Sequence, residues 1–293
     1  MAEVRLADCA GFCFGVKRAV DTVHAQVKTG KKIYTYGPIV HNDEVVRELE
    51  ALGVGVLENE KELTELVSKD RGDGEKEIVV VIRAHGVPKR IYDCMEQNGL
   101  ECVDATCPFV KRIHRIVEKE SLEGKHIVIL GNPGHPEVEG IRGWCHGAAD
   151  VLETEEEALE YMPPEGKTLC VVAQTTFNYN KFKHIVEIFQ KKGYNDTVVN
   201  TICNATKERQ EAARALAREA DVMIVIGGKH SSNTRKLYDI CKGECEYTCF
   251  LETLDDLHLE ELPKSIRLVG ITAGASTPNK LIEEVQNYVR INF

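Results

Sequence analysis

The stretch DATCPFVKRIH, residues 104–114, decides the fold, because it places a cysteine between a β-like run and an amphipathic helix. Cys107 occupies the position where the helix begins. Pro108 takes the first helical position, where its missing N–H costs no hydrogen bond. Serine, threonine, aspartate or asparagine would cap the helix better than a thiol does. The thiol therefore indicates a chemical role for this position.

The same pattern occurs three times along the chain. Cys13, Cys107 and Cys203 are separated by 94 and 96 residues (107 − 13 and 203 − 107), and each is preceded by a short β-like run and followed by a helical pattern. Each copy then repeats a second apolar run, a polar residue 28 positions after the cysteine, an apolar run ending in Leu-Glu, and a closing apolar run. The chain is therefore a triplicated unit.

Short apolar runs that alternate with helical patterns predict parallel sheets built from βαβ units. We predict three similar small parallel-sheet α/β domains, arranged as a pseudo-threefold trefoil around a central cluster. The predicted domains are residues 1–106, 107–202 and 203–293, and the N-terminal strand could complete another lobe. Ligands of such sheets gather at the carboxyl ends of the strands, where the three cysteines lie.

Composition restricts the function. The 293 residues carry a net charge of −10, which argues against nucleic acid as a partner. No apolar run reaches the length of a membrane span and the start lacks the features of a signal peptide, so we expect a cytoplasmic protein with no membrane partner. Eleven cysteines in a reducing compartment indicate metal binding or buried thiols, not a disulfide framework.

Three thiols at equivalent repeat positions favour a soft metal, either zinc or an iron–sulfur cluster. The three cysteines lack short C-x-x-C spacings, and their helix N-termini would stabilise an anionic cluster, so a cubane suits them better than structural zinc. Three protein ligands for four irons leave one iron open. Cys9 is expected to be buried in the strand before Cys13. Cys241, Cys245 and Cys249 occur in one repeat only, and we interpret them as surface or packing thiols.

Polar side chains follow the apolar runs in all three copies. Histidines occur in the first two, and hydroxyl and amide side chains occur at the corresponding places of the third. Imidazoles, hydroxyls and backbone N–H groups together can bind a phosphate or diphosphate, although no P-loop is present. The candidates are His41, His85, His135, Ser231, Ser232, Asn233 and Ser276.

The loop GHPEVEG supplies one carboxylate to the same group. Glu137 lies two residues after His135, and the segment AQTT adds the hydroxyl of Thr175. A chain with 47 acidic residues makes a solvated surface acid the ordinary interpretation of any one of them. Its place beside a ring histidine favours a proton donor in a dry cavity instead.

These segments resemble a known family. CFGVKRAV, VHNDEVV, AHGVP, DATCPFV, GHPEVEG, QTT, CNATKERQ, SSNT and TAGAST are similar to the motifs of the 4-hydroxy-3-methylbut-2-enyl diphosphate reductase (IspH/LytB) family, in this order, over residues 3–285. The resemblance implies a three-lobed α/β oxidoreductase around one 4Fe-4S cluster. It also implies the last step of non-mevalonate isoprenoid biosynthesis, the two-electron reductive dehydration of an allylic diphosphate to isopentenyl and dimethylallyl diphosphates.

The resemblance also assigns roles, position by position. It implies Cys13, Cys107 and Cys203 as cluster ligands with an open iron, and Glu137 as the proton donor. Reduced ferredoxin or flavodoxin is implied as the electron donor. The substrate-binding residues that it implies are His41, His85, His135, Thr175, Ser231, Ser232, Asn233 and Ser276.

Two alternative functions are compatible with the residues. One is a quinolinate-synthase-like iron–sulfur dehydratase, which also uses three cysteines and an open iron. Its substrate carries carboxylates, so inhibition by diphosphate would argue against it. The other is a non-catalytic iron–sulfur sensor, which needs neither a diphosphate site nor Glu137.

Overall fold

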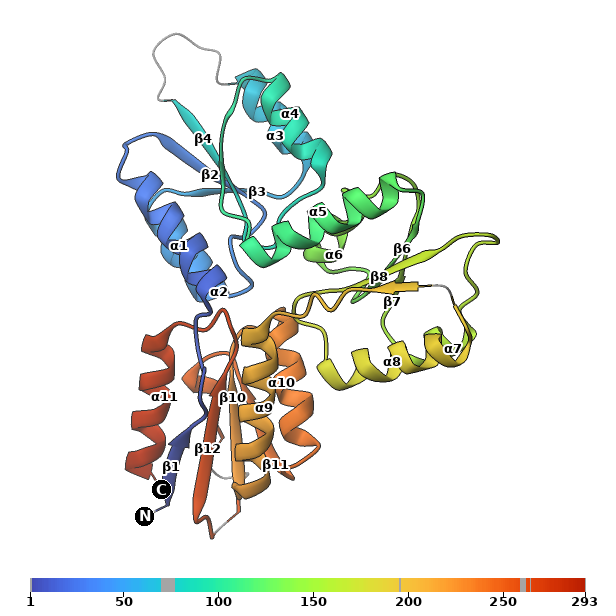
Figure 1. Ribbon diagram of the computed structural model, residues 1–293. Coiled ribbons are helices and arrows are strands. Elements are labelled where there is room, and N and C mark those ends of the chain that lie inside the picture. Colours follow the sequence, from blue (N-terminus) through green and yellow to red (C-terminus); the bar gives the residue numbers. More distant parts are fainter. Residues whose placement is uncertain (1, 70–76, 195, 259–261, 264, 293) are drawn as a thin grey trace. The chain divides into compact units, whose positions relative to one another are not determined.

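The chain forms two compact units. Figure 1 labels their helices and strands. The residues that the computed structural model describes are 2–69, 77–194, 196–258, 262–263 and 265–292. The first unit comprises Met1–Lys17, His41–Val45 and Cys203–Phe293. The second comprises Arg18–Val40 and Val46–Ile202.

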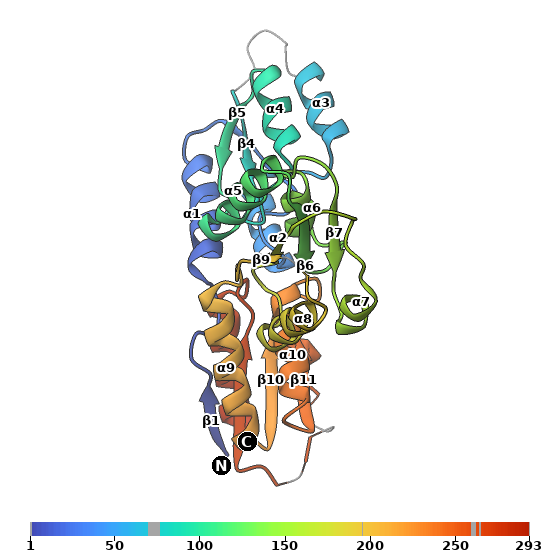
Figure 2. The same cartoon turned by 45° about the vertical axis from the view of Figure 1, so that its right-hand side comes forward.

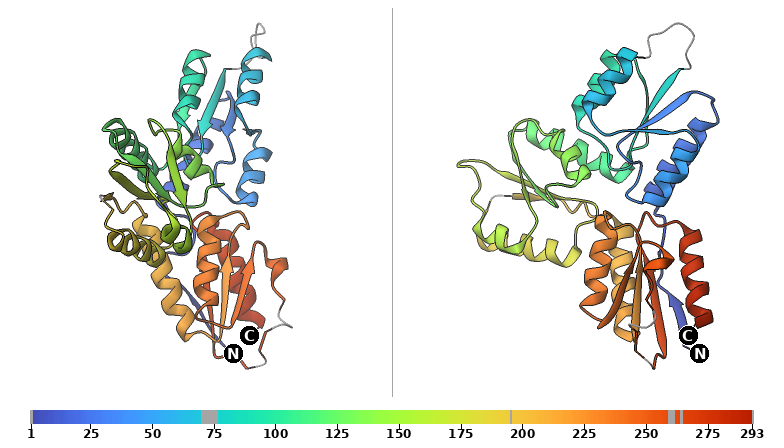
Figure 3. Two further views of the ribbon diagram at one scale, coloured as in Figure 1. Left: turned by 90° about the vertical axis from the view of Figure 1, so that its right-hand side faces the viewer. Right: turned by 180° about the vertical axis from the view of Figure 1, so that it is seen from behind.

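The first unit contains one four-stranded parallel sheet of order β1-β12-β10-β11. Its strands are β1 (Glu3–Leu6), β10 (Val222–Ile226), β11 (Tyr247–Leu251) and β12 (Leu268–Ala273). Its helices are α9 (Asn204–Glu219), α10 (Ser232–Lys242), the short 3-10 helix η1 (Leu254–Asp256) and α11 (Asn279–Asn292). Figure 3 shows that both chain ends lie at the same end of this sheet.

Helices cover both faces of this sheet. Val222, Ile224 and Ile226 pack in one core with the apolar side chains of α11. The alternating residues Met223 and Val225 pack in a second core with α9 and α10, which lie together beside the strands in Figure 2. Because both faces are buried, the strand is continuously apolar, as expected for a parallel sheet between two helical layers.

The second unit contains two further four-stranded parallel sheets, of order β3-β2-β4-β5 and β7-β6-β8-β9. The strands of the first of these are β2 (Lys32–Tyr36), β3 (Gly55–Leu57), β4 (Ile78–Ile82) and β5 (Glu101–Asp104). Those of the other are β6 (His126–Leu130), β7 (Ala149–Leu152), β8 (Leu169–Ala173) and β9 (Asp196–Val198). The remaining helices are α1 (Phe14–Val27), α2 (Asp43–Ala51), α3 (Glu60–Lys69), α4 (Lys89–Gln97), α5 (Pro108–Leu122), α6 (Pro136–Arg142), α7 (Glu155–Glu160) and α8 (Tyr179–Lys191).

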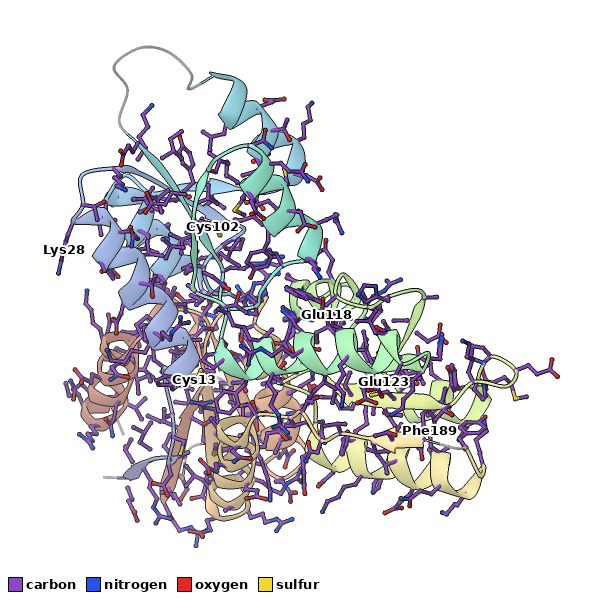
Figure 4. The ribbon with its side chains drawn as sticks, turned by 45° about the horizontal axis from the view of Figure 1, so that its top comes forward. Cys13, Lys28, Cys102, Glu118, Glu123 and Phe189 are labelled. Atoms are coloured by element: carbon purple, nitrogen blue, oxygen red, sulfur yellow. The ribbon has the colours of Figure 1, made fainter. Side chains whose placement is uncertain are left out.

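The sheet of β6 to β9 is also covered on both faces. Val128 and Leu130 pack with α7 and α8, where Phe189 belongs to the core (Figure 4). Ile127 and Ile129 pack in the opposite core with α5 and α6. The helix that follows Cys107 and the helix that carries Glu137 therefore share one face of this sheet.

The prediction of three similar α/β lobes with parallel sheets is confirmed. All three sheets have the same strand order, and the strand that precedes each cysteine, β1, β5 or β9, is an edge strand of its sheet. The trefoil arrangement and the three domain boundaries stay predictions. Within the described residues, no helix is both long enough and apolar enough to cross a membrane.

The expectation for Cys9 is wrong. β1 ends at Leu6, and Cys9 lies beyond it as an exposed residue. Among the described residues, Cys9 is the one non-glycine residue with positive φ, at 62°. The left-handed conformation turns the chain away from the strand direction, so the apolar pattern of the strand does not extend to this thiol.

Candidate active site

Each of the three repeated cysteines stands where a helix begins. Cys107 and Cys203 are the N-cap residues of α5 and α9, and neither thiol makes a capping hydrogen bond. Cys13 directly precedes α1 (Figure 4). Their backbone carbonyls accept the first helical hydrogen bonds, from the N–H groups of Lys17 at 2.9 Å, Lys111 at 3.0 Å and Lys207 at 3.1 Å. The helix starts are therefore formed by the backbone, and the partly exposed thiols are not used as caps.

Other cysteines of the chain have a different environment. Cys170 and Cys241 are fully buried, and burial raises their pKa values to about 11 and about 12. Burial likewise raises the pKa of Cys145 to about 12. Thiols of this kind stay protonated and pack as small apolar groups. Cys245 is also buried, and Cys249 is partly buried in β11, which agrees with packing roles.

The predicted site residues fall into two groups. The first unit holds Cys13, His41, Cys203, Ser231, Ser232, Asn233 and Ser276. The second unit holds His85, Cys107, His135, Glu137 and Thr175.

In the first unit, polar residues gather at the carboxyl ends of the neighbouring strands β10 and β12. Ser231 is the N-cap of α10, and its Oγ accepts a hydrogen bond from the backbone N–H of Thr234 at 3.3 Å. Ser276 donates from Oγ to the carbonyl oxygen of His41 at 3.1 Å. Gly228 approaches the same carbonyl so closely that a Cβ there would lie 2.8 Å from it. The loops after both strands are thus held around the His41 backbone.

Asn233 lies in the first turn of α10 and is the least satisfied member of this group. It is 4% exposed, and neither its amide oxygen nor its amide nitrogen has a hydrogen-bond partner. A buried polar group without a partner costs about 1–3 kcal/mol. Beside it, Ser232 accepts a hydrogen bond from Lys236 Nζ at 3.2 Å. The N-terminus of α10 therefore combines an open amide, a helix dipole and a cation, which together suit an anion.

In the second unit, Glu137 is held in the first turn of α6 with 2% exposure. The backbone N–H of Thr175 donates to Oε1 at 2.6 Å, and the Thr175 hydroxyl donates to Oε2 at 2.7 Å. Thr175 follows β8 and Glu137 follows β6, so the parallel sheet brings the two residues to the same edge. The carboxyl group is buried and fixed, with a hydroxyl in position to relay a proton.

Two of the predicted histidines lie next to each other in this unit. The rings of His85 and His135 meet edge to face with their centroids 5.4 Å apart. His135 caps α6, because its Nδ1 accepts the backbone N–H of Glu137 at 3.1 Å. Nδ1 is therefore the unprotonated nitrogen, and Nε2 carries the proton.

Two buried polar residues were missed by the sequence reasoning. Arg209 is 2% exposed, and its Nη2 donates to the carbonyl oxygen of Gly11 at 2.7 Å. His114 is also 2% exposed, stacks on Trp144 with ring centroids 5.1 Å apart, and leaves Nε2 without a partner. A signal existed in both cases. Arg209 lies on the buried stripe of α9 and His114 on that of α5, at positions that helical periodicity reserves for apolar residues.

The surroundings of Arg209 in the first unit are compatible with the iron–sulfur group that the sequence implies. Nε and Nη1 of Arg209 are buried without a hydrogen-bond partner. Burial lowers the pKa of the guanidinium, and the thiols of Cys13, Cys9 and Cys203 oppose this lowering. A buried cation needs an anion. Thiolates that hold a metal group are such an anion.

The fold and these groups define the class of protein: an α/β enzyme with thiols at three helix N-termini, a buried amide without a partner and a buried carboxyl group. The model of one family, described as LytB protein, matches residues 4–290. The chain belongs to the LytB family.

Relatives of known name agree in length and in fold. The chain is 46% identical over 285 residues to a 4-hydroxy-3-methylbut-2-enyl diphosphate reductase from Caldanaerobacter subterraneus subsp. tengcongensis, covering 97% of this chain and 95% of the relative. It superposes with a TM-score of 0.87, at 29% identity, on the structure of the E-1-hydroxy-2-methyl-but-2-enyl-4-diphosphate reductase from Plasmodium falciparum, covering 99% of this chain and 87% of the other. A second structure, titled as that of (E)-4-hydroxy-3-methyl-but-2-enyl diphosphate reductase, the terminal enzyme of the non-mevalonate pathway, matches with a TM-score of 0.65 at 41% identity, covering 99% of this chain and 100% of the other.

Proposed function

We propose that this chain is a 4-hydroxy-3-methylbut-2-enyl diphosphate reductase that catalyses the last step of the non-mevalonate isoprenoid pathway. The substrate's allylic C–O bond breaks, a C–H bond forms, and two electrons and two protons are consumed with release of water. The products are isopentenyl and dimethylallyl diphosphates. Membership of the LytB family favours this reaction over that of a quinolinate-synthase-like dehydratase and over a sensor.

The observation that carries the chemistry is the buried Glu137 with its two hydrogen bonds from Thr175. Loss of a hydroxyl group as water requires a proton. The Thr175 hydroxyl would give its proton to the leaving group and take one from the protonated form of Glu137, which leaves the carboxylate that accepts from Thr175. His135 positions the acid, because its ring accepts the backbone N–H of Glu137. Exclusion of water from this carboxyl group prevents the proton from exchanging with solvent.

The substrate's diphosphate is an anion, and the receptor proposed for it centres on the N-terminus of α10. The unpartnered amide of Asn233 supports this assignment, because a ligand oxygen would complete its hydrogen bonds. Ser231, Ser232 and Ser276 supply hydroxyls from the same strand ends. The proposed substrate residues are completed by His41, His85, His135 and Thr175. The anchored diphosphate would supply binding energy and orientation for the reaction.

The cofactor proposed is one 4Fe-4S cluster held by Cys13, Cys107 and Cys203, with one open iron. Each thiol stands at a helix N-terminus, whose positive end stabilises an anionic cluster. When bound, the cluster supplies the electrons and a Lewis-acidic iron. A reduced ferredoxin or flavodoxin is proposed as the electron donor.

An anaerobic assay tests the function. The protein reconstituted with iron and sulfide should convert the allylic diphosphate, with a reduced dye as electron source, to the two isoprenoid diphosphates. Inorganic diphosphate should compete with the substrate. Absence of product from protein that holds a full cluster would reject the proposed reaction.

The ligand assignment has its own test. Cys13→Ser, Cys107→Ser and Cys203→Ser should each lose cluster iron and sulfide and all turnover. Cys249→Ser is the matched control, since that thiol lies in a strand of the same fold, and it should retain both. A full cluster in Cys203→Ser, or its loss in Cys249→Ser, would overturn the assignment.

A further inference from the structure

Arg209 is a cation for which the described residues provide no carboxylate. Burial lowers the pKa of its guanidinium, and the ionisable groups that oppose this effect, among the residues described, are the thiols of Cys13, Cys9 and Cys203, in that order. An arginine of the same helix shows the ordinary situation. Arg218 is 63% exposed in its side chain and pairs with Glu244 at 3.1 Å. The surroundings of Arg209 therefore lack a fixed acid and contain thiols instead.

The cost of this arrangement is large unless an anion is present. An unpaired buried charge is strongly destabilising, so proteins usually pair such a charge or keep it at the surface. Two of the three guanidinium nitrogens have no hydrogen-bond partner. A side chain placed in this way is suited to an anion that arrives together with the thiols.

The remaining nitrogen connects two of the proposed ligands. Nη2 of Arg209 donates to the carbonyl oxygen of Gly11 at 2.7 Å, and Arg209 lies on the helix that Cys203 begins. The backbone N–H of Cys13 donates to the carbonyl oxygen of Ala275 at 3.1 Å on the other side of the loop. The segment between Cys9 and Cys13 is thus fixed both to α9 and to the segment that follows β12.

The backbone of this segment leaves little freedom. Gly11 has φ +91°, and a Cβ there would lie 2.8 Å from Asn279 Oδ1 and 2.9 Å from Ile282 Cδ1. Cys9 adopts a left-handed conformation that is strained for a residue with a side chain. The packing around the loop and the Arg209 hydrogen bond together hold this conformation.

We propose that Arg209 is a positioning residue for the metal centre, which ties the Cys13 loop to the Cys203 helix and supplies a fixed positive charge to the thiolate-held cluster. This inference rests on the proposed function. Two consequences follow from it. The tie slows release of the cluster, and the charge stabilises the reduced cluster, which carries one more negative charge than the oxidised one.

Three variants separate the two effects: Arg209→Gln, Arg209→Lys and the control Arg218→Gln on the exposed side of the same helix. Each is reconstituted anaerobically as the full chain, and both the rate of cluster bleaching by a chelator and the midpoint potential are measured. Arg209→Gln should release the cluster at least about tenfold faster. Its equilibrium constant for one-electron reduction should fall at least about tenfold, which corresponds to a potential lower by about 59 mV.

Arg209→Lys keeps the charge but replaces the planar guanidinium with an ammonium on a flexible stem. Its potential should stay close to that of the unchanged protein, while its cluster is released faster. Arg218→Gln should match the unchanged protein in both measurements. A residue that only packs in the core would not move the potential in this charge-dependent way.

The outcomes distinguish this inference from the function on which it rests. Potential and release rate in Arg209→Gln equal to those of Arg218→Gln would overturn the inference alone. If Arg209→Gln does not accumulate as folded protein, Arg209→Lys carries the test, and release as slow as in the unchanged protein would overturn the tie. Failure of the unchanged protein to take up iron and sulfide would overturn the proposed function, and this inference with it.

Discussion

The N-termini of α6 and α10 occupy the same place in two copies of the repeat, but their buried side chains differ in hydrogen bonding. His135 and Ser231 each lie 28 residues after their cysteine (135 − 107 and 231 − 203), and each caps its helix. Two residues further on, Glu137 and Asn233 are both buried, at 2% and 4% exposure. Glu137 is bonded through both oxygens, whereas the amide of Asn233 has no partner at either atom.

The difference teaches how one scaffold position serves two tasks. At α6 the partner of the buried group comes from within the chain, the threonine that follows β8, so the acid is fixed in the absence of substrate. At α10 none of the described residues supplies a partner, so the buried amide is left to a group from outside the chain, a water molecule or a ligand. The same position of the repeat thus holds a buried group with partners from the chain in one lobe and a buried group without them in another.

The largest expected effect is on turnover and comes from a change at Glu137. Glu137→Gln keeps the size of the side chain and its ability to hydrogen-bond but cannot supply a proton. General acid catalysis contributes about 10²–10⁴-fold, so turnover should fall by that factor while competition by inorganic diphosphate is unchanged. Steady-state assays with the reduced dye measure both quantities.

The same helix supplies the control for that variant. Glu139 is 58% exposed in its side chain and lies 3.8 Å from Arg90 in a surface ion pair. Glu139→Gln should therefore retain nearly full turnover, since exposed ion pairs contribute little. Normal turnover in Glu137→Gln would mean that the proton comes from another group. If Glu139→Gln then has no turnover, Glu139 is the proton donor and the assignment of Glu137 is wrong.

A smaller effect, on inhibition by inorganic diphosphate, is expected from a change at Asn233. Asn233→Ala removes an amide that has no partner, so the free energy of unfolding without ligand should not fall. Inhibition by inorganic diphosphate should weaken about 10- to 100-fold, because a hydrogen bond to a charged group contributes about 1.5–3 kcal/mol. Asn180→Ala, at an exposed position of α8, is the control. Equal inhibition of the two variants would show that α10 is not the anion receptor.

A last effect, on stability and not on turnover, distinguishes the helices that support the two sites. His114 and Gln210 are repeat equivalents, each seven residues after its cysteine (114 − 107 and 210 − 203), and both are buried. Burial lowers the pKa of His114 to about 4, against an opposing effect of Asp104. Below about pH 6.5 the unfolded chain binds a proton here that the folded chain does not, so stability should fall by about 1.4 kcal/mol per pH unit down to about pH 4.

His114→Gln, which places the residue of the third copy in the second, should lose this contribution. Denaturant unfolding of both proteins at several pH values between 4 and 7 measures the difference in slope. Parallel curves would show that His114 takes up its proton equally in the folded and unfolded chains.

Much of the fold was predictable because the repeat is local. Alternating apolar runs and helical patterns predicted the strands and helices, and four landmarks in each copy predicted three equivalent sheets. The start of α5 at Cys107 and Pro108 was predicted from the preference of proline for the first helical position. The failure at Cys9 has a local cause too, since β1 already ends at Leu6 and Cys9 takes a left-handed conformation beyond it.

The sequence by itself determined the composition of the site: which cysteines begin helices, which polar residues follow strands, and that one acid stands beside a ring histidine. These features depend on spacing along the chain, and the periodicity of strands and helices translates spacing into position. Only the tertiary structure decided which of these groups are satisfied. Thr175 reaches Glu137 from another strand, and Asn233 and Arg209 are left buried without full partners, because such pairings depend on packing between segments far apart in the chain.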